Sequence, residues 1–314
     1  MTILTALYLA TQKLQKSSPS PHLDAEVLLS YVLKKPKEYL FANPDFKLNK
    51  LKARSYKLLI AKRSKRWPVA YLIGHKEFFG LDFKVTPDVL IPRPETELLV
   101  EQALKEIKDE RLTIRNVIDV GTGSGCIVIS LAKQLSLRAK RGNLRLFATD
   151  ISTKALRVAK LNAKRHGVAK KIKFLRGDLL STILKSKNLS LDSSIFIANL
   201  PYLSPKKIKS NPDLRHEPRS ALDGGKDGLK YFRMLFRQIN SNVIASTAKQ
   251  SKDRLPRRPA IGGTPRNDNL TLLLEHDPSQ KSALSKLTKK YFPKSKLKFH
   301  NDLSSNLRIT ELSC

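Results

Sequence analysis

The chain has 314 residues, enough for two domains and a substantial buried core, and its two cysteines exclude a disulfide framework. It carries 60 Lys and Arg against 27 Asp and Glu, a net charge of +33, which favours an anionic partner such as RNA, a ribosomal particle or an acidic protein. A basic bias spread along the chain would explain this charge equally well. Because there is no metal-ligand spacing, basic leader or long apolar run, we expect a cytosolic protein without a metal or a membrane span.

Residues 1–72 are predicted to form a small helical domain. Apolar residues recur at helical intervals in 21–29, and 51–66 reads as a second, Lys-rich helix. Pro36 and Pro44 separate the two segments. No catalytic constellation stands out in this part of the chain.

Residues 73–94 are predicted to link two domains. Aromatic and β-branched residues flank a glycine in 77–85, a pattern typical of a short β-hairpin. Prolines then stiffen the chain up to Pro94. A helix is expected from Glu95, with acidic residues in its first turn where the helix dipole favours them.

Residues 95–314 are predicted to form an α/β domain. Strands separated by helices imply βαβ units and a mostly parallel sheet, and 297–312 reads as a terminal antiparallel hairpin. The expected strands before that hairpin are 117–120, 144–149, 172–175, 194–198 and 270–274.

Two segments interrupt this alternation. Residues 136–143 and about 241–269 are basic, rich in Gly or Pro, and without sustained periodicity. We interpret both as surface insertions, since long loops add little closure entropy. A nucleic-acid-binding arm would be expected to interleave aromatic residues for stacking, and these segments contain none.

A glycine-rich turn follows the strand at 116–120. Its glycines allow the backbone to adopt positive φ and to pass close to a ligand. This pattern alone is shared by many nucleotide-binding enzymes. The expected cofactor-binding residues of the turn are Gly121, Thr122, Gly123, Ser124 and Gly125.

Acidic residues after the following strands sharpen the cofactor prediction. Asp150 ends the next strand, where a carboxylate can accept hydrogen bonds from both ribose hydroxyls. Asp178 and Leu179 follow the strand after that and can hold an adenine amino group and cover its ring. Asp119 is either a structural acid at a strand end or a contact to the amino-acid part of the cofactor.

The segment Asn199-Leu200-Pro201-Tyr202 suits a site that methylates a planar, conjugated nitrogen. The Asn199 side-chain oxygen and the Leu200 carbonyl can each accept a hydrogen bond from an NH2 group, and the Tyr202 ring can cover its flat face. We therefore expect Asn199, Pro201 and Tyr202 to carry the catalysis. With the glycine turn, this segment favours S-adenosylmethionine (SAM) over NAD as cofactor.

These residues resemble the HemK/PrmC family, the glutamine-N5 methyltransferases of class I peptide-chain release factors. The resemblance covers nearly the whole chain outside the two insertions. Its most specific part is Ile91-Pro92-Arg93-Pro94-Glu95-Thr96-Glu97, and it extends to 216–218, 221–229 and 272–276. Such a family member has a helical substrate-docking domain before a Rossmann-like, class I SAM-dependent methyltransferase domain with a seven-stranded sheet.

The resemblance also implies a substrate and a set of site residues. The substrate would be the glutamine of the Gly-Gly-Gln motif in class I release factors, modified by a cytoplasmic monomer that needs no nucleic-acid or ribosome contact. Gly121 to Gly125, Asp150 and Leu179 would bind SAM, to which Asn199 would add a contact. The residues that would bind the glutamine are Asn199, Leu200, Pro201 and Tyr202, with Arg93 and Glu97 near the reacting centre.

Two positions depart from the family pattern. The family normally has Pro where this chain has Leu200, which should reduce preorganisation while leaving the acceptor carbonyl in place. It usually has Gly where this chain has Asp277, which would carry a modest strain if the turn needs positive φ.

Two other functions remain open from the sequence. A nucleic-acid methyltransferase acting on an exocyclic amine of adenine or guanine would use Asn-x-Pro-Tyr equally well, and the charge suits it. Such enzymes usually add a target-recognition region that this chain lacks. A catalytically weakened SAM-binding homologue is the other alternative, and SAM binding without methyl transfer to any partner would indicate it.

Overall fold

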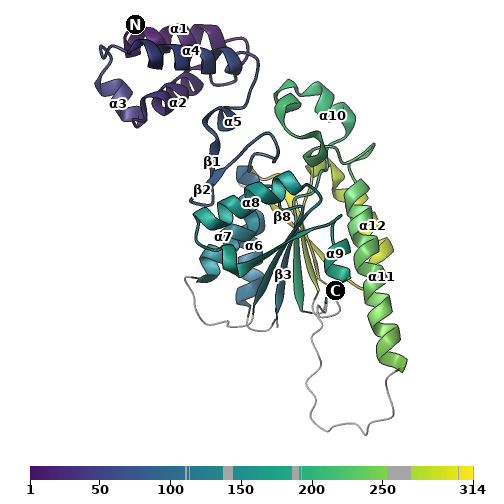
Figure 1. Cartoon of the computed structure of the whole chain (residues 1–314). Helices are drawn as coiled ribbons and strands as arrows, with labels where there is room; N and C mark the ends of the chain where they lie inside the picture. Colours follow the sequence, from purple (N-terminus) through teal and green to yellow (C-terminus); the bar gives the residue numbers. More distant parts are fainter. Residues whose placement is uncertain are drawn as a thin grey trace.

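A helical unit and an α/β unit are joined by a β-hairpin (Figure 1). The computed structural model describes residues 1–109, 112, 114–136, 144–185, 191, 193–252, 270–302 and 304–313, and of 243–252 the helical backbone alone. In these parts of the chain, no helix combines the length and the apolarity that a membrane crossing requires.

Five helices form the N-terminal unit, which confirms the helical character predicted there. The Thr2 and Asn49 side chains cap the first and fourth helices by accepting hydrogen bonds from backbone N–H groups of the first turn. Leu28 and Leu29, both fully buried, lie in its apolar core. The helices are α1 (Ile3–Leu14), α2 (Pro21–Leu33), α3 (Lys37–Ala42), α4 (Lys50–Arg63) and α5 (Val69–Ile73).

The predicted hairpin is present as β1 (His75–Phe78) and β2 (Leu81–Lys84), paired antiparallel. Asn162 fastens it to the α/β unit. Its side chain accepts a hydrogen bond from Lys84 N at 2.8 Å and donates to the Lys84 carbonyl at 3.0 Å and the Ser124 carbonyl at 2.9 Å. One buried amide therefore connects the hairpin to the glycine-rich turn.

The α/β unit contains a seven-stranded sheet with the order β5-β4-β3-β6-β7-β9-β8. The first five of these strands are parallel, and β9 pairs antiparallel with both β7 and β8, which confirms the predicted fold class. The strands are β3 (Asn116–Val120), β4 (Arg145–Asp150), β5 (Ile172–Arg176), β6 (Ser194–Ala198), β7 (Thr271–Glu275), β8 (Lys296–Asn301) and β9 (Leu307–Ser313).

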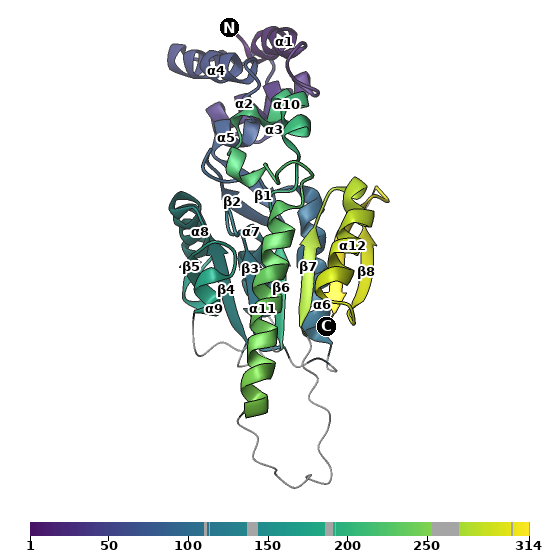
Figure 2. The same ribbon diagram turned by 90° about the vertical axis from the view of Figure 1, so that its right-hand side faces the viewer.

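Helices cover both faces of this sheet (Figures 1 and 2). Side chains alternate along the fully buried strand β6: Ile195 and Ile197 belong to the core under α6 and α7, whereas Phe196 and Ala198 belong to the core under α11. The longer helices are α6 (Glu97–Lys108), α7 (Cys126–Ser136), α8 (Thr153–Arg165), α11 (Lys230–Lys252) and α12 (Lys281–Tyr291).

Shorter helices and turns of 3-10 helix complete the fold. The short α-helices are α9 (Ser181–Leu184) and α10 (Pro205–Ser210). The 3-10 turns are η1 (Pro94–Thr96), η2 (Ala169–Lys171), η3 (Pro212–His216), η4 (Arg219–Ala221) and η5 (Pro278–Gln280).

The interpretation of 241–269 as an irregular insertion is wrong for its first part. Residues 241–252 continue α11, which Figure 1 shows extending past the sheet. The reason is composition: this stretch has no Gly or Pro and includes the helix formers Ala, Gln and Lys. Ser136 likewise ends α7, while 137–143 and 253–269 lie outside the described residues.

A buried ion pair tests the packing of the N-terminal unit. Arg63 Nε donates to Asp24 Oδ2 at 2.6 Å, and both side chains are almost fully buried. Asp24→Ala leaves the guanidinium without its partner, so we expect a loss of about 3 kcal/mol in unfolding free energy. Urea unfolding followed by the fluorescence of Trp67, the single tryptophan, measures it.

The double variant Asp24→Ala/Arg63→Met is the control for this prediction. It removes both charges and keeps an apolar stem, so most of the lost stability should return. A double variant no more stable than Asp24→Ala would show that the charges are not the cause.

Candidate active site

Two cavities meet at the carboxyl ends of the parallel strands. The inner cavity, of about 240 Å³, lies over the glycine-rich turn, and the outer cavity, of about 870 Å³, lies between the N-terminal unit and the α/β unit. Asn199 lines both cavities, as do Arg93 and Leu200. This is the point where the strand order reverses, between β3 and β6, and ligands of open α/β sheets bind at such a reversal.

The glycines of the turn are required by the local geometry. Gly121, Gly123 and Gly125 all have positive φ, of 76°, 55° and 84°. A Cβ on Gly125 would lie 2.8 Å from Ile129 Cδ1 and 3.1 Å from Ala159 Cβ. The sequence therefore needs glycine here for close packing of the turn on the helices, which leaves backbone lining the inner cavity.

Asp150 is held in place on the wall of the inner cavity. Its Oδ2 accepts a hydrogen bond from Gly123 N at 2.9 Å, and its Oδ1 accepts one from Ser152 N at 2.8 Å. Burial raises the pKa of the carboxyl, against the lowering effect of these backbone N–H groups. The carboxylate is thus fixed with acceptor capacity to spare for a ligand.

Asp178 and Leu179 line the same cavity. Leu179 is buried and has a φ of 52°, in the left-handed region that side chains other than glycine rarely adopt. Such strained backbone persists where the surroundings fix it and is concentrated at ligand sites. The observation supports a ligand contact by this pair.

Asp119 does not line either cavity. It is fully buried, and its Oδ2 accepts a hydrogen bond from the Thr122 hydroxyl at 2.6 Å. Of the two functions left open by the sequence, the structural one fits this placement. Thr122 lines the inner cavity, so Asp119 acts on the cavity by fixing the turn.

Asn199 belongs to a buried hydrogen-bond network. Its Nδ2 donates to Thr96 Oγ1 at 3.0 Å, and the Thr96 hydroxyl donates to Glu275 Oε2 at 2.7 Å. The Tyr202 hydroxyl donates to Glu275 Oε1 at 3.0 Å. Burial is the main cause that raises the pKa of both Glu275 and Tyr202.

The backbone carbonyl of Tyr202 is held by Gln280 and packed closely against Gly228. Gln280 Nε2 donates to the Tyr202 carbonyl at 3.0 Å. A Cβ on Gly228 would lie 2.1 Å from that same carbonyl oxygen, so only glycine fits against the segment. Leu200 is almost fully buried, and its Cδ2 lies where a side chain on Gly121 would collide. The strand end therefore has little freedom.

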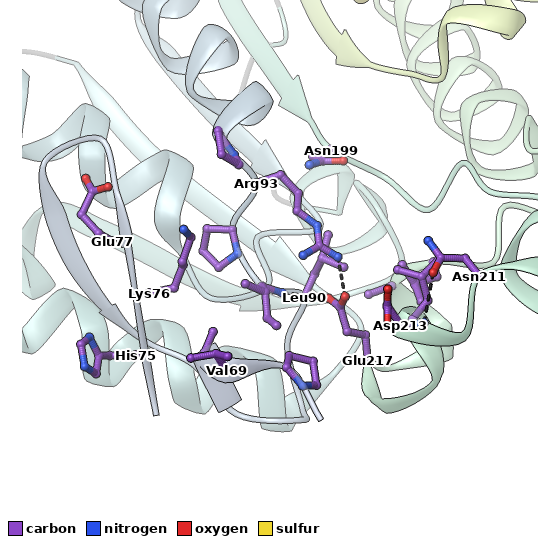
Figure 3. Close-up of a pocket in the computed structure, with 18 of the residues that line it drawn as sticks. Val69, His75, Lys76, Glu77, Leu90, Arg93, Asn199, Asn211, Asp213 and Glu217 are labelled. Carbon is purple, nitrogen blue, oxygen red and sulfur yellow. Dashed lines mark hydrogen bonds and ion pairs between the residues drawn. The ribbon is translucent and has the colours of Figure 1, made fainter. Parts of the chain in front are cut away.

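Arg93 and Glu97 differ in placement. Arg93 lines both cavities and forms an ion pair with the buried Glu217, which also accepts a hydrogen bond from Ile91 N (Figure 3). Glu97 accepts a hydrogen bond from Phe79 N at 2.8 Å and lines neither cavity. Arg93 thus lines the same two cavities as Asn199, whereas Glu97, at the start of α6, binds the hairpin.

Contacts between the two units lie beside the outer cavity. Arg66 Nη1 lies 2.9 Å from Asp213 Oδ1, and the ring of Trp67 stacks on that of His216 with centroids 4.4 Å apart. These contacts come from the segment after Asn-x-Pro-Tyr and from the segment that follows α4. Figure 3 shows Asn199, Asp213 and Glu217 around this cavity.

The expected strain at Asp277 is wrong. Its φ is −70°, which any residue adopts, and its side chain caps η5 in a capping box with Gln280. Lys207 Nζ adds an ion pair at 2.8 Å. This departure from the family pattern therefore stabilises the turn.

Three residues with polar roles in the site were missed by the sequence reasoning: Thr96, Glu217 and Glu275. Each lies in a segment that the sequence singles out, and each is buried. A carboxylate ending an otherwise apolar strand, as in Leu272-Leu273-Leu274-Glu275, was an available signal, since buried carboxylates need partners.

Comparison with known proteins agrees with this geometry. A family model described as a methyltransferase domain matches residues 115–285, more than half of the chain, and one described as the PrmC N-terminal domain matches residues 5–74. With the fold and the two cavities, this places the chain among the class I SAM-dependent methyltransferases. Among solved structures, the hMettl16 catalytic domain is 15% identical with a TM-score of 0.49, covering 90% of both chains, which is too distant to bear on substrate.

Three curated relatives show the family of this chain. The release factor glutamine methyltransferase of Coxiella burnetii is 40% identical over 235 residues, 74% of this chain and 79% of the relative. That of Moorella thermoacetica is 41% identical over 238 residues, 75% and 79%. That of Vibrio cholerae is 39% identical over 235 residues, 74% and 77%. The chain belongs to the release factor glutamine methyltransferase family, which confirms the resemblance found in the sequence.

Asp119 gives a pH-dependent prediction. Burial raises the pKa of its carboxyl from 3.8 to about 7, so the folded chain keeps a proton that the unfolded chain has released. The stability from this group is present below about pH 4 and is lost as the pH rises to about 7. Asp119→Asn stays neutral throughout, so wild type should lose stability relative to it by on the order of 2 kcal/mol between about pH 5 and pH 7.

Urea unfolding of both proteins across that pH range measures the effect. Parallel stability profiles for wild type and Asp119→Asn would show that the carboxyl does not hold a proton in the folded state.

Proposed function

We propose that this chain transfers a methyl group from SAM to the side-chain amide nitrogen of the glutamine in the Gly-Gly-Gln motif of class I peptide-chain release factors. The family supplies the substrate class, since the relatives are named for release factor glutamine methylation. The observation that carries the assignment of the site is the position of Asn199. It lies on the wall common to both cavities, with its amide nitrogen already engaged by Thr96.

The inner cavity fits SAM. Residues 121–124 of the glycine-rich turn line this cavity and offer backbone at close range, as an adenosine-containing ligand requires, whereas Gly125 packs against Ile129 and Ala159. Asp150 has the free acceptor capacity to bind both ribose hydroxyls, and Asp178 with Leu179 would hold and cover the adenine. When bound, SAM supplies a methyl group attached to a positively charged sulfur, and this sulfur is a good leaving group.

The glutamine would enter from the outer cavity. A glutamine amide has an NH2 group whose two N–H bonds need acceptors. Asn199 Oδ1 would accept one and the Leu200 carbonyl the other, while Tyr202, fixed at both its hydroxyl and its carbonyl, would cover the amide plane. Pro201 restrains the backbone of Leu200 to the extended form that aims this carbonyl.

The chemistry follows from the amide. Its nitrogen lone pair is delocalised into the carbonyl, so it is a poor nucleophile, and a side-chain base cannot deprotonate it near neutral pH. What these residues can supply is position: two acceptors hold the nitrogen in line with the methyl group. Orientation of this kind reaches ~7–11 kcal/mol in model reactions. The same acceptors stabilise the nitrogen as it becomes positive, before it releases a proton to solvent.

The charges around the outer cavity favour a protein substrate. Four Lys or Arg residues line it against six Asp or Glu residues. The basic residues are Arg63, Arg66, Lys76 and Arg93, and the acidic ones are Asp24, Glu77, Asp82, Asp213, Glu217 and Glu275. A nucleic-acid backbone would need a basic groove here. The net charge of the chain is therefore not concentrated where the substrate would bind.

Three further features belong to this proposal. Residues 1–72 would dock the release factor, and residues 95–314 would bind SAM and transfer the methyl group. Residues 73–94 would link these two domains. The enzyme would act as a monomer, since one chain supplies all the residues proposed for the site, and in the cytoplasm, where translation terminates. Arg93 would stand beside the reacting centre, held by Glu217.

The cofactor assignment is tested at Asp150. Asp150→Ala removes the acceptor for two ribose hydroxyls, and hydrogen bonds to a charged group contribute about 1.5–3 kcal/mol each. We expect SAM affinity, measured by calorimetry, to fall by on the order of a hundredfold or more. The exposed Asp45→Ala is the matched control. Equal affinities in the two variants would remove Asp150 from the cofactor site.

The substrate assignment is tested at Asn199. Asn199→Ala should cost on the order of 3 kcal/mol in transition-state stabilisation, about a hundredfold in kcat/KM, because it removes one preorganised acceptor. Steady-state kinetics with purified release factor measure this change, and thermal unfolding serves as the control for folding. Turnover within about threefold of wild type would rule out the role.

A further inference from the structure

Behind Asn199 lies a chain of hydrogen bonds whose direction can be deduced. Glu275, at the end of β7, is almost fully buried, and its two carboxylate oxygens meet the hydroxyls of Thr96 and Tyr202. Thr96, which precedes α6, is buried as well and contacts Asn199 through the same hydroxyl oxygen. Three elements far apart in sequence therefore converge on one carboxylate.

In its ionised form Glu275 has acceptors only, so both hydroxyls then donate to it. The Thr96 hydroxyl has a single proton and gives it to Glu275, which leaves its oxygen only able to accept from Asn199. The group of Asn199 that faces Thr96 must then be NH2. The oxygen of the amide is consequently turned away from Thr96.

We propose that Glu275 and Thr96 are positioning residues that fix which end of the Asn199 amide faces the substrate, and so select a substrate that presents N–H groups. This inference rests on the proposed contact between Asn199 and the glutamine. The shape of an asparagine amide is nearly the same when it is flipped, so packing alone does not choose between the two ends. The buried carboxylate makes the choice.

The selection has a chemical consequence. Glutamine offers two N–H donors to the acceptors of the site, whereas ionised glutamate offers only oxygens. An oxygen of glutamate would face the Asn199 oxygen with no proton between them. A release factor with Gly-Gly-Glu should therefore bind less tightly than one with Gly-Gly-Gln, and the difference should depend on Thr96.

The test compares two substitutions of one residue. Thr96→Val keeps the shape and removes the hydroxyl, and Thr96→Ser keeps the hydroxyl and removes a methyl group. We expect Thr96→Val to lower kcat/KM for release factor about tenfold to a hundredfold, by analogy with the loss of the hydrogen-bond partner behind a metal ligand. Thr96→Ser should restore activity to within about threefold of wild type.

The readout specific to orientation is the ratio of two affinities. For wild type and Thr96→Val, the dissociation constants of Gly-Gly-Gln and Gly-Gly-Glu release factors are measured. The ratio of the two dissociation constants, which measures the preference for glutamine, should fall about fivefold or more in Thr96→Val. The Asn199 amide can then turn its NH2 group toward the carboxylate of the substrate glutamate. A role limited to fastening α6 to the sheet would leave the ratio unchanged and would overturn the proposal.

A double-mutant cycle separates this inference from the function it rests on. In the Asn199→Ala background, Thr96→Val should have no further effect on kcat/KM, because its influence passes through Asn199. If Asn199→Ala itself is nearly as active as wild type, the proposed contact with glutamine fails. If Asn199→Ala is impaired but the two losses add in full, the contact stands and the positioning role fails.

Thermal unfolding shows whether each variant folds. Should Thr96→Val not fold, Thr96→Ala removes the same hydroxyl with less crowding and is put through the same affinity ratio. An unchanged ratio in a folded Thr96→Ala protein overturns the proposal in the same way.

Discussion

The parallel pairing of β3 with β6 is the constraint on which the site depends. Val120 pairs with Ala198, so the two strands end together and the glycine-rich turn begins beside Asn199. The strand order reverses between them, and the chains that follow separate and leave room for ligands. Leu200 then packs against Gly121, so that the cofactor turn and the substrate segment support each other.

The linker after the hairpin is part of the same construction. Ile91 and Arg93 bind Glu217, Thr96 joins Asn199 to Glu275, and Glu97 holds the hairpin through Phe79. These contacts tie the linker to three different parts of the α/β unit and the hairpin: the segment around Glu217, the ends of β6 and β7, and Phe79. The orientation of the N-terminal unit, and with it the outer cavity, is thereby coupled to the residues around Asn199.

Much of the fold could be predicted because its signals are local. The period of apolar residues marks the strands and helices, and the hairpin and the glycine turn follow from backbone preferences. The continuation of α11 through 241–252 was missed because basic, polar helix formers lack an apolar period. The Thr96–Glu275–Tyr202 network could not be read from sequence, since its partners lie up to 179 positions apart and meet only through the strand order.

The most direct test of the account is methyl transfer from labelled SAM to a purified class I release factor, compared with the same factor carrying Gly-Gly-Ala. DNA and RNA are offered in parallel. We expect label on the Gly-Gly-Gln protein and on none of the others, with the net charge of the chain playing no part. Equal label on the Gly-Gly-Ala protein, or label on nucleic acid in place of the release factor, would contradict it.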